Sequence, residues 1–175
     1  HCLSWLAANG TAAIVCFPGI MYRSGAEKKI RQYLVDNGYV DCVIQLPGNL
    51  FFGTPIATNI LILRRGKQDS TTLFIDASKE CVKVTNSNKL TQDNIEHIVQ
   101  FFTERKEMPH VVHLASYEEI VKQDYNLSVS SYVETEDVRE KIDIVKLNEE
   151  IRNIVAREQA LRDEIDKIIA EIEVG

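Results

Sequence analysis

The stretch that decides the fold is LPGNLFFGTPIATNILILRR, residues 46–65. It joins the end of one apolar strand, expected over residues 41–47, to a second strand of nearly unbroken aliphatic residues over 58–65. The loop between these strands is too short to contain a helical crossover. We therefore predict that the second strand runs antiparallel to the first.

The loop within this stretch has an unusual composition. Residues 47–49 form a turn, two adjacent aromatic residues follow at Phe51 and Phe52, and Gly53 precedes a rigid exit at 54–55. The loop follows the carboxyl end of a strand, which is where open α/β sheets bind their ligands. Two interpretations stay open: the aromatic pair fills the core, or it forms a wall on which a flat ligand such as a nucleobase stacks.

The residues before this stretch predict a strand and then a helix. TAAIVCF, residues 11–17, is a continuous apolar run typical of a central strand that is covered on both faces. Ser24 and Glu27 form a capping-box pattern, and the helix that begins there continues to about Asn37. The core-facing side chains of this helix are expected to be Ile30, Tyr33 and Leu34. Strand, helix and strand in this order favour a parallel βαβ unit.

The residues after the stretch predict a further strand and two helices. A strand is expected over 71–78, at an edge of the sheet or at the start of a return. Thr91 caps a helix over 92–106, and Ser116 with Glu119 forms a second capping box before a short helix. The longer helix is expected to turn Ile95, Ile98, Val99 and Phe102 inward. Extended segments are expected over 110–114 and 125–133.

The composition is that of an ordinary globular protein, with 45% apolar and 26% charged residues among 175. No apolar run approaches the roughly 18 residues of a membrane span.

The first residues, HCLSWLAANG, lack an initiator methionine and a basic signal-peptide flank, so we expect a piece of a longer chain. His110 and His113 form a weak metal-binding pattern, and no metal is expected. The cysteines are interpreted as small buried residues in a reducing cytoplasm: Cys2, Cys16, Cys42 and Cys81.

The C-terminal residues differ in character from the rest. Residues 134–175 contain 13 acidic and 7 basic residues, and they carry the whole net charge of −6. Acid-then-base pairs stand four residues apart at Asp137/Lys141, Glu158/Arg162 and Asp163/Lys167. Apolar residues recur at the spacing of a coiled-coil seam, which Glu158 interrupts: Leu147, Ile151, Ile154, Leu161, Ile165, Ile168 and Ile172. We expect one long amphipathic helix, or two with a break, whose seam packs on its own domain or, as we favour, on a partner helix.

Signatures of catalysis are missing from the sequence. It contains no GxGxxG, no Walker loop and no HExxH motif. Taken on motifs alone, the chain is a non-catalytic α/β module that presents a coiled-coil tail to a partner. This interaction module is one of two hypotheses, and the other comes from a family resemblance.

Several stretches carry that resemblance: residues 10–65, which begin GTAAIVCFPGIMYR and end with the opening stretch, LFIDAS at 73–78, NKLTQDNIEHIVQFF at 88–102 and EEIVKQDYNLSVSSYV at 118–133. Together they closely resemble the modification (M) subunit of type I restriction-modification systems. The resemblance implies an N6-adenine DNA methyltransferase that uses S-adenosylmethionine. It also implies a seven-stranded Rossmann-like sheet, of which residues 11–17, 41–47 and 58–65 are the fifth, sixth and seventh strands, the last one antiparallel.

The resemblance also shows which parts of such an enzyme are missing here. Members carry a Gly-rich cofactor loop and an Asn-Pro-Pro-Phe/Tyr motif, and neither occurs in this sequence, whose prolines stand apart at Pro18, Pro47, Pro55 and Pro109. Catalysis requires both reactants to be held at near-attack distance. We therefore predict that this chain alone neither binds S-adenosylmethionine nor methylates DNA, so no catalytic residue is assigned to it.

What remains is implied to be the target-base side of the cleft. The predicted pocket consists of Asn49, Phe51, Phe52 and Thr54, with the aromatic residues stacking near a flipped adenine. Three basic residues after the loop either meet phosphate or, as we favour, form a solvated strand end: Arg64, Arg65 and Lys67.

The resemblance assigns partners as well. Residues 1–133 are expected to form the C-terminal half of the methyltransferase domain, and residues 134–175 a helical tail that docks on the specificity (S) subunit. A second M subunit and a restriction (R) subunit complete the complex, and DNA is bound through it. The isolated chain is also expected to be prone to self-association, through an open sheet edge or through the tail.

Overall fold

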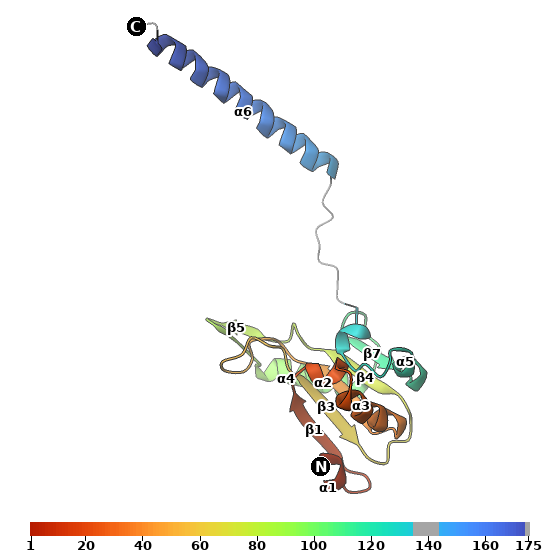
Figure 1. The fold of residues 1–175 in the computed structure, drawn as a ribbon. Coiled ribbons are helices and arrows are strands. Elements are labelled where there is room, and N and C mark those ends of the chain that lie inside the picture. Colours follow the sequence, from red (N-terminus) through yellow and green to blue (C-terminus); the bar gives the residue numbers. More distant parts are fainter. Residues whose placement is uncertain (135–143, 174–175) are drawn as a thin grey trace. The chain divides into compact units, whose positions relative to one another are not determined.

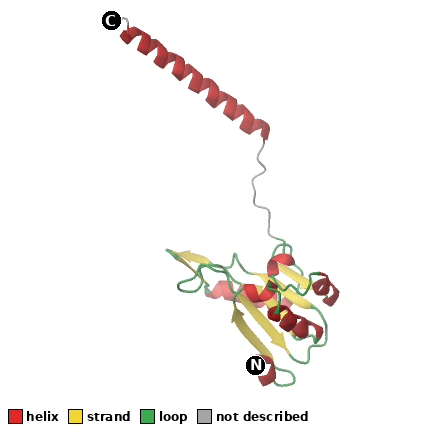
Figure 2. Ribbon diagram, viewed as in Figure 1, coloured by secondary structure: helices red, strands yellow, loops and turns green. Residues whose placement is uncertain are grey.

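The structure is a computed structural model that describes residues 1–134 and 144–173. It divides into two compact units, His1–Glu136 and Asp137–Gly175, which are described separately. Figure 2 shows that the first unit mixes helices and strands, whereas the second contains a single long helix. The expected mixed α/β class is therefore confirmed. No helix in the described parts of the chain is long and apolar enough to cross a membrane.

A five-stranded sheet organises the first unit (Figure 1). Its strands, in spatial order, are β1 (Thr11–Cys16), β3 (Asn59–Arg64), β2 (Val40–Gln45), β4 (Thr72–Asp76) and β7 (Val112–Ala115). β3 is antiparallel to both of its neighbours, β1 and β2, so the predicted antiparallel pairing across the opening stretch is confirmed. β4 is parallel to β2, and β7 is antiparallel to β4.

Helices pack on the two faces of this sheet (Figures 1 and 2). One face carries α2 (Gly19–Tyr22), α3 (Ala26–Asp36), α5 (Tyr117–Lys122) and the 3-10 turn η1 (Val129–Ser131). The other face carries α4 (Gln92–Glu104), and a short helix α1 (Cys2–Trp5) precedes β1. Successive residues of a strand point to opposite faces, so the continuous apolar sequence of β3 supplies both cores. Leu61 and Leu63 join the α3 side, while Ile60 and Ile62 join the α4 side.

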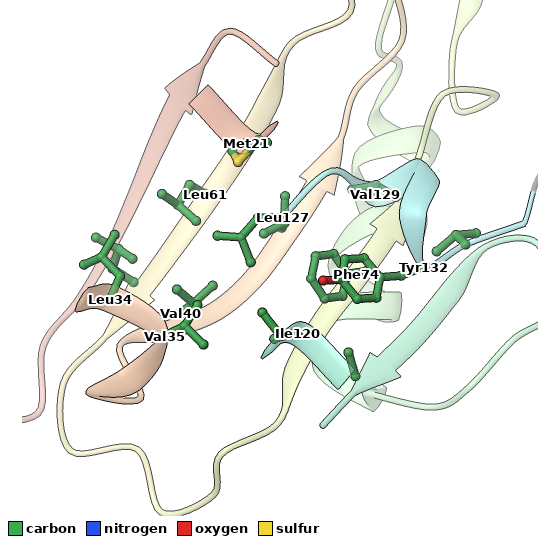
Figure 3. Close-up of a cluster of buried hydrophobic side chains, with 14 residues drawn as sticks. Met21, Leu34, Val35, Val40, Leu61, Phe74, Ile120, Leu127, Val129 and Tyr132 are labelled. Carbon is green, nitrogen blue, oxygen red and sulfur yellow. The ribbon is translucent and has the colours of Figure 1, made fainter. Parts of the chain in front are cut away.

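The core on the α3 side is built around Phe74 of β4 (Figure 3). Its ring stacks on that of Tyr132, with ring centroids 3.9 Å apart and an interplanar angle of 13°. Ile120, Leu127 and Val129 are fully or almost fully buried in the same cluster. This packing ties the segment after α5 to the centre of the sheet.

Two strand positions differ from the prediction. β1 is an edge strand within the described part of the sheet, and Val15 is 56% exposed although a strand covered on both faces was expected. Among the described strands β1 pairs only with β3, and the face that carries Val15 borders an open recess beside the loop after β2. For the strand expected over 71–78, at an edge or at the start of a return, the edge position is wrong: β4 is interior, because it lies between β2 and β7.

The predicted cap and buried face of α3 are wrong in part. Gly25 (φ 80°) is the N-cap residue and Ser24 makes no capping bond, so the expected capping box does not form. Leu34 is buried as predicted, but Ile30 and Tyr33 are exposed. The buried face instead includes Arg31, whose guanidinium donates to the carbonyl oxygens of Ile20 and Tyr125, each at 2.8 Å.

The predicted cap of α4 forms, and that of α5 forms in part. The Thr91 side chain accepts from the Asn94 amide while the Asn94 side chain accepts from Thr91. Ser116 accepts from the Glu119 amide, but the Glu119 carboxylate contacts His113 and does not complete the predicted capping box. On α4, Ile98 is buried and Phe102 is partly buried, but Ile95 and Val99 stay exposed, contrary to the prediction. They line an open apolar recess between this helix and the sheet. The segment 125–133, expected to be extended, contains the 3-10 turn.

The second unit contains the helix α6 (Ile144–Glu173), a single unbroken helix. Residues 138–143, where the helix was expected to begin, lie outside the described residues, as does the Asp137/Lys141 pair. Arg162 donates to Glu158 at 2.7 Å, as the spacing predicted. The side chains of Lys167 and Ile172 are not among those described.

Candidate functional site

The loop after β2 is a tight, internally bonded turn. The Asn49 amide donates to the Pro55 carbonyl oxygen at 3.2 Å, and the Thr54 amide donates to that of Phe51 at 3.4 Å. Asn49 (φ 53°) and Gly53 (φ 76°) adopt the left-handed backbone conformation that such a turn requires. A Cβ on Gly48 would come within 2.9 Å of the Pro55 carbonyl oxygen, so the two arms of the loop approach too closely for any other residue.

A hairpin that the sequence did not predict holds this loop from outside. It consists of β5 (Val82–Val84) and β6 (Ser87–Lys89). The Asn88 amide donates to the Asn49 carbonyl oxygen at 2.8 Å, and the Asn88 side chain donates to that of Gly48 at 2.7 Å. A single asparagine therefore fixes both residues at the start of the loop.

The aromatic pair does not fill the core. Phe51 is 45% exposed and Phe52 is fully exposed, whereas Leu50 packs against the core on the α4 side. All four residues of the predicted pocket line one recess of about 440 Å³, together with residues of the hairpin turn. The lining consists of Asn49, Phe51, Phe52, Gly53, Thr54, Pro55, Asn86 and Ser87.

A second recess of about 250 Å³ adjoins the same loop at the end of β1. It is lined by Val15, Cys16, Phe17, Phe51, Thr54 and Thr58. Phe51 and Thr54 line both recesses, so the loop forms a wall shared between them. Sequence reasoning missed Phe17 and Thr58, because only the pairing of β1 with β3 brings them to the loop. Their one signal in the sequence is that each is the terminal residue of a predicted strand, Phe17 at the end of 11–17 and Thr58 at the start of 58–65.

The chemistry of these recesses favours binding over proton transfer. Aromatic and aliphatic groups form the walls, and amide and hydroxyl groups are the polar members. Among the residues that the structure describes, no carboxylate, lysine or histidine lines either recess. Burial raises the pKa of the Cys16 thiol, which disfavours the thiolate that a cysteine nucleophile requires. The arrangement suits a flat, uncharged ligand group.

The basic residues at the end of β3 and just after it contact other groups of the protein, and the solvated strand end that we favoured is wrong for two of the three. Arg65 donates to the Leu6 carbonyl oxygen at 2.9 Å. Lys67 is nearly buried and donates to the carbonyl oxygens of Val40 and Thr71. Arg64 is half-exposed and lies 3.9 Å from the buried carboxylate of Asp41.

The remaining candidates for chemistry have local structural partners. His113 lies between two carboxylates, 2.7 Å from Glu107 and 2.9 Å from Glu119, and His110 contacts the Glu134 carbonyl oxygen. Within residues 1–134 and 144–173, no cluster of histidine, cysteine and acidic side chains is arranged to hold a metal ion. All four cysteines are free thiols. Cys42 is fully buried, as predicted, Cys16 and Cys81 are partly buried, and Cys2 is exposed, so the prediction of a buried residue is wrong for Cys2.

Comparison with known sequences identifies close relatives. A sequence model of the family described as N-6 DNA methylase matches residues 1–141. The type I restriction enzyme MpnII methylase subunit of Mycoplasma pneumoniae is 45% identical over 175 residues, which cover 99% of this chain and 32% of that protein. The MjaVIII methylase subunit of Methanocaldococcus jannaschii is 37% identical over 149 residues, which cover 82% of this chain and 26% of that protein. The chain thus spans about a third or less of the length of these relatives.

Solved structures agree with the sequence matches. The methyltransferase subunit of a type I restriction-modification system from Streptococcus thermophilus superposes with a TM-score of 0.71 at 43% identity, over 73% of this chain and 27% of that one. The M protein of the type I restriction enzyme EcoKI superposes with a TM-score of 0.58 at 16% identity, over 90% of this chain and 41% of that one. The second likeness shows a shared fold alone.

Proposed function

The chain belongs to the N-6 DNA methylase family, and on this premise we propose that it is the C-terminal part of the M subunit of a type I restriction-modification complex. The complete subunit transfers a methyl group from S-adenosylmethionine to N6 of adenine in DNA. The observation that carries the proposal is the 45% identity to a type I methylase subunit over the whole chain, together with the loop recess at the carboxyl end of β2. The family membership favours this function over a non-catalytic interaction module.

In this proposal, β1, β2 and β3 are the fifth, sixth and seventh strands of a Rossmann-like methyltransferase sheet. Support comes from β3, which runs antiparallel between β1 and β2. The exposed side chains at the end of β1 also support it, because Val15 and Phe17 offer apolar surface for further protein to cover.

The residues of this chain do not fit S-adenosylmethionine. The sequence has no Gly-rich strand turn, and neither loop recess offers a carboxylate for ribose hydroxyl groups. We therefore propose that the rest of the subunit binds the cofactor and supplies the Asn-Pro-Pro-Phe/Tyr motif. This chain contributes the side of the active-site cleft that faces the cofactor and that motif, and it does not methylate DNA alone.

That side of the cleft is proposed to receive the target adenine. Phe51 stands between the two recesses, and Phe52 is free to stack because its ring has no neighbour to bury it. Stacking of a base on an aromatic side chain contributes about 1–3 kcal/mol. Asn49 and Thr54 supply amide and hydroxyl groups for the edge of the base. The hairpin holds the loop in place through Asn88, so the wall exists before the base enters.

Phe51→Ala in the complete enzyme is expected to slow DNA methylation about 5- to 150-fold, because the loss of about 1–3 kcal/mol of stacking acts on the flipped base. The measurement is the single-turnover methylation rate, with binding measured in parallel to a duplex that carries an abasic target site. Binding to the abasic duplex should not change, because that duplex has no base to stack. Phe51→Tyr is the conservative control and should retain most of the rate. Unchanged methylation in both Phe51→Ala and Phe52→Ala would remove the pocket assignment.

The tail is proposed to dock on the S subunit, in a complex that also contains a second M subunit and the R subunit. Its support is the exposed apolar seam of α6. Deletion of residues 138–175 from the complete M subunit is expected to abolish co-purification with the S subunit, because the seam is then lost. The check is affinity purification through a tag on the S subunit. Retention of a stoichiometric complex would refute the docking role.

A further inference from the structure

The helix α6 presents an apolar face that has the spacing of a coiled coil. Its described seam residues are between 45% and 66% exposed: Leu147, Ile151, Ile154, Leu161, Ile165 and Ile168. Val155 and Ile169 widen the same face and are also exposed. Exposure of this apolar seam to water is unfavourable, and α6 is stabilised when a second helix covers the seam.

Glu158 stands in the middle of this apolar face. It lies four residues after Ile154 and three before Leu161, which is the seam position that an apolar residue would occupy. Its carboxylate contacts Arg162 at 2.7 Å, but both side chains are more than half exposed, so the pair is a weak surface interaction. When another helix covers the seam, this carboxylate loses water and requires a positive partner.

A second copy of α6 does not provide that partner. In a parallel pair of copies, Glu158 faces its counterpart, and two carboxylates then share one buried layer. Arg157 and Arg162 occupy flanking positions that also meet across a parallel pair, so like charges oppose each other there too. In an antiparallel pair, Glu158 lies in a layer with Ile154 or Leu161 of the other copy, and neither of these seam residues offers it a positive charge.

We infer that α6 pairs with a helix of a different protein chain that places a lysine or arginine against Glu158, and that Glu158 discriminates against pairing with a second copy. This inference rests on the proposed docking of the tail and names the chemistry of its partner. A buried polar group in an apolar seam is a known means of fixing the partner and register of a coiled coil.

The first experiment measures self-association of the chain by sedimentation equilibrium. Glu158→Ile completes the seam and is expected to tighten self-association at least about tenfold, because a buried charge is replaced by an apolar side chain. Glu149→Ile is the matched control, since Glu149 lies nine residues earlier and therefore on the opposite side of the helix. Self-association through the edge of β1 contributes equally to all three proteins. Equal self-association of wild type and Glu158→Ile would overturn the inference.

The second experiment uses the complete M subunit with its S subunit. Glu158→Lys is expected to weaken the complex at least about tenfold by placing two positive charges together, whereas Glu149→Lys should leave it unchanged. Equal behaviour of the two lysine variants would overturn the inference while tail docking stands. If deletion of 138–175 leaves the complex intact, the proposed docking itself fails, and the partner inferred here fails with it.

Discussion

Phe74→Ala is expected to lower the free energy of unfolding of the chain by about 3–5 kcal/mol, because it removes a large, fully buried side chain from the centre of the sheet. Phe74 has no exposed surface and stacks on Tyr132 (Figure 3). An aromatic pair of this kind adds about 0.5–1.5 kcal/mol beyond its buried area. The ring is enclosed from both sides by the sheet and the segment after α5, so neighbouring groups are expected to refill only part of the cavity.

Urea denaturation of the 175-residue chain measures this loss. Phe17→Ala is the matched control, because it is the same chemical change at a side chain that is 60% exposed. Substitution of an exposed side chain is expected to lower the free energy of unfolding by about 0.5 kcal/mol or less. A loss for Phe74→Ala no larger than the loss for Phe17→Ala would contradict the packing described here.

The parts of the fold that the sequence predicted are those that local patterns determine. The apolar runs at 41–47 and 58–65 became β2 and β3, and the short loop between them required an antiparallel pair. Thr91 predicted a helix start because a cap depends on residues three positions apart. The seam of α6 followed from residue spacing for the same reason.

The parts that the sequence did not predict depend on contacts between distant residues. Arg31 replaces Ile30 on the buried face of α3 because the carbonyl oxygens of Ile20 and Tyr125 accept its hydrogen bonds. The edge position of β1 depends on where β3 inserts, which no local pattern encodes. The hairpin β5–β6 is short, polar and exposed, so it has no apolar alternation to reveal it.

The candidate site shows the same division. Its four predicted residues lie within six positions of one loop, and their unusual composition indicated the site. Phe17, Thr58 and the hairpin turn join it only through strand pairing and through the bonds of Asn88. The sequence therefore predicted the residues that the loop contributes to the site, but not those that β1, β3 and the β5–β6 hairpin bring to it.

Asp41→Leu is expected to lower the free energy of unfolding by about 3–5 kcal/mol, because it breaks a buried charge network. Asp41 is 1% exposed, and its carboxylate accepts from Arg105 at 3.1 Å. Arg105, which follows α4 in a left-handed conformation, would keep a mostly buried guanidinium that has lost the carboxylate of Asp41. Urea denaturation measures the loss. Lys28→Leu is the control, since it breaks only the exposed pair with Asp124 and is expected to cost about 1 kcal/mol or less.

The pH dependence of this loss gives a second test. Burial lowers the pKa of Lys67, while Asp69 and Asp41 raise it, so removal of Asp41 should lower this pKa further. Between the lowered folded pKa and the unfolded value of 10.5, the unfolded chain binds more protons, so stability rises with pH. The difference in the free energy of unfolding between Asp41→Leu and wild type should therefore become smaller as the pH rises towards 10.5. The reason is that Lys67 becomes neutral in both folded proteins. The double variant Asp41→Leu/Arg105→Leu should recover more than half of the loss at neutral pH, since both charges are then gone. A loss for Asp41→Leu that matches that of Lys28→Leu at every pH would show that the network contributes no more than a surface ion pair.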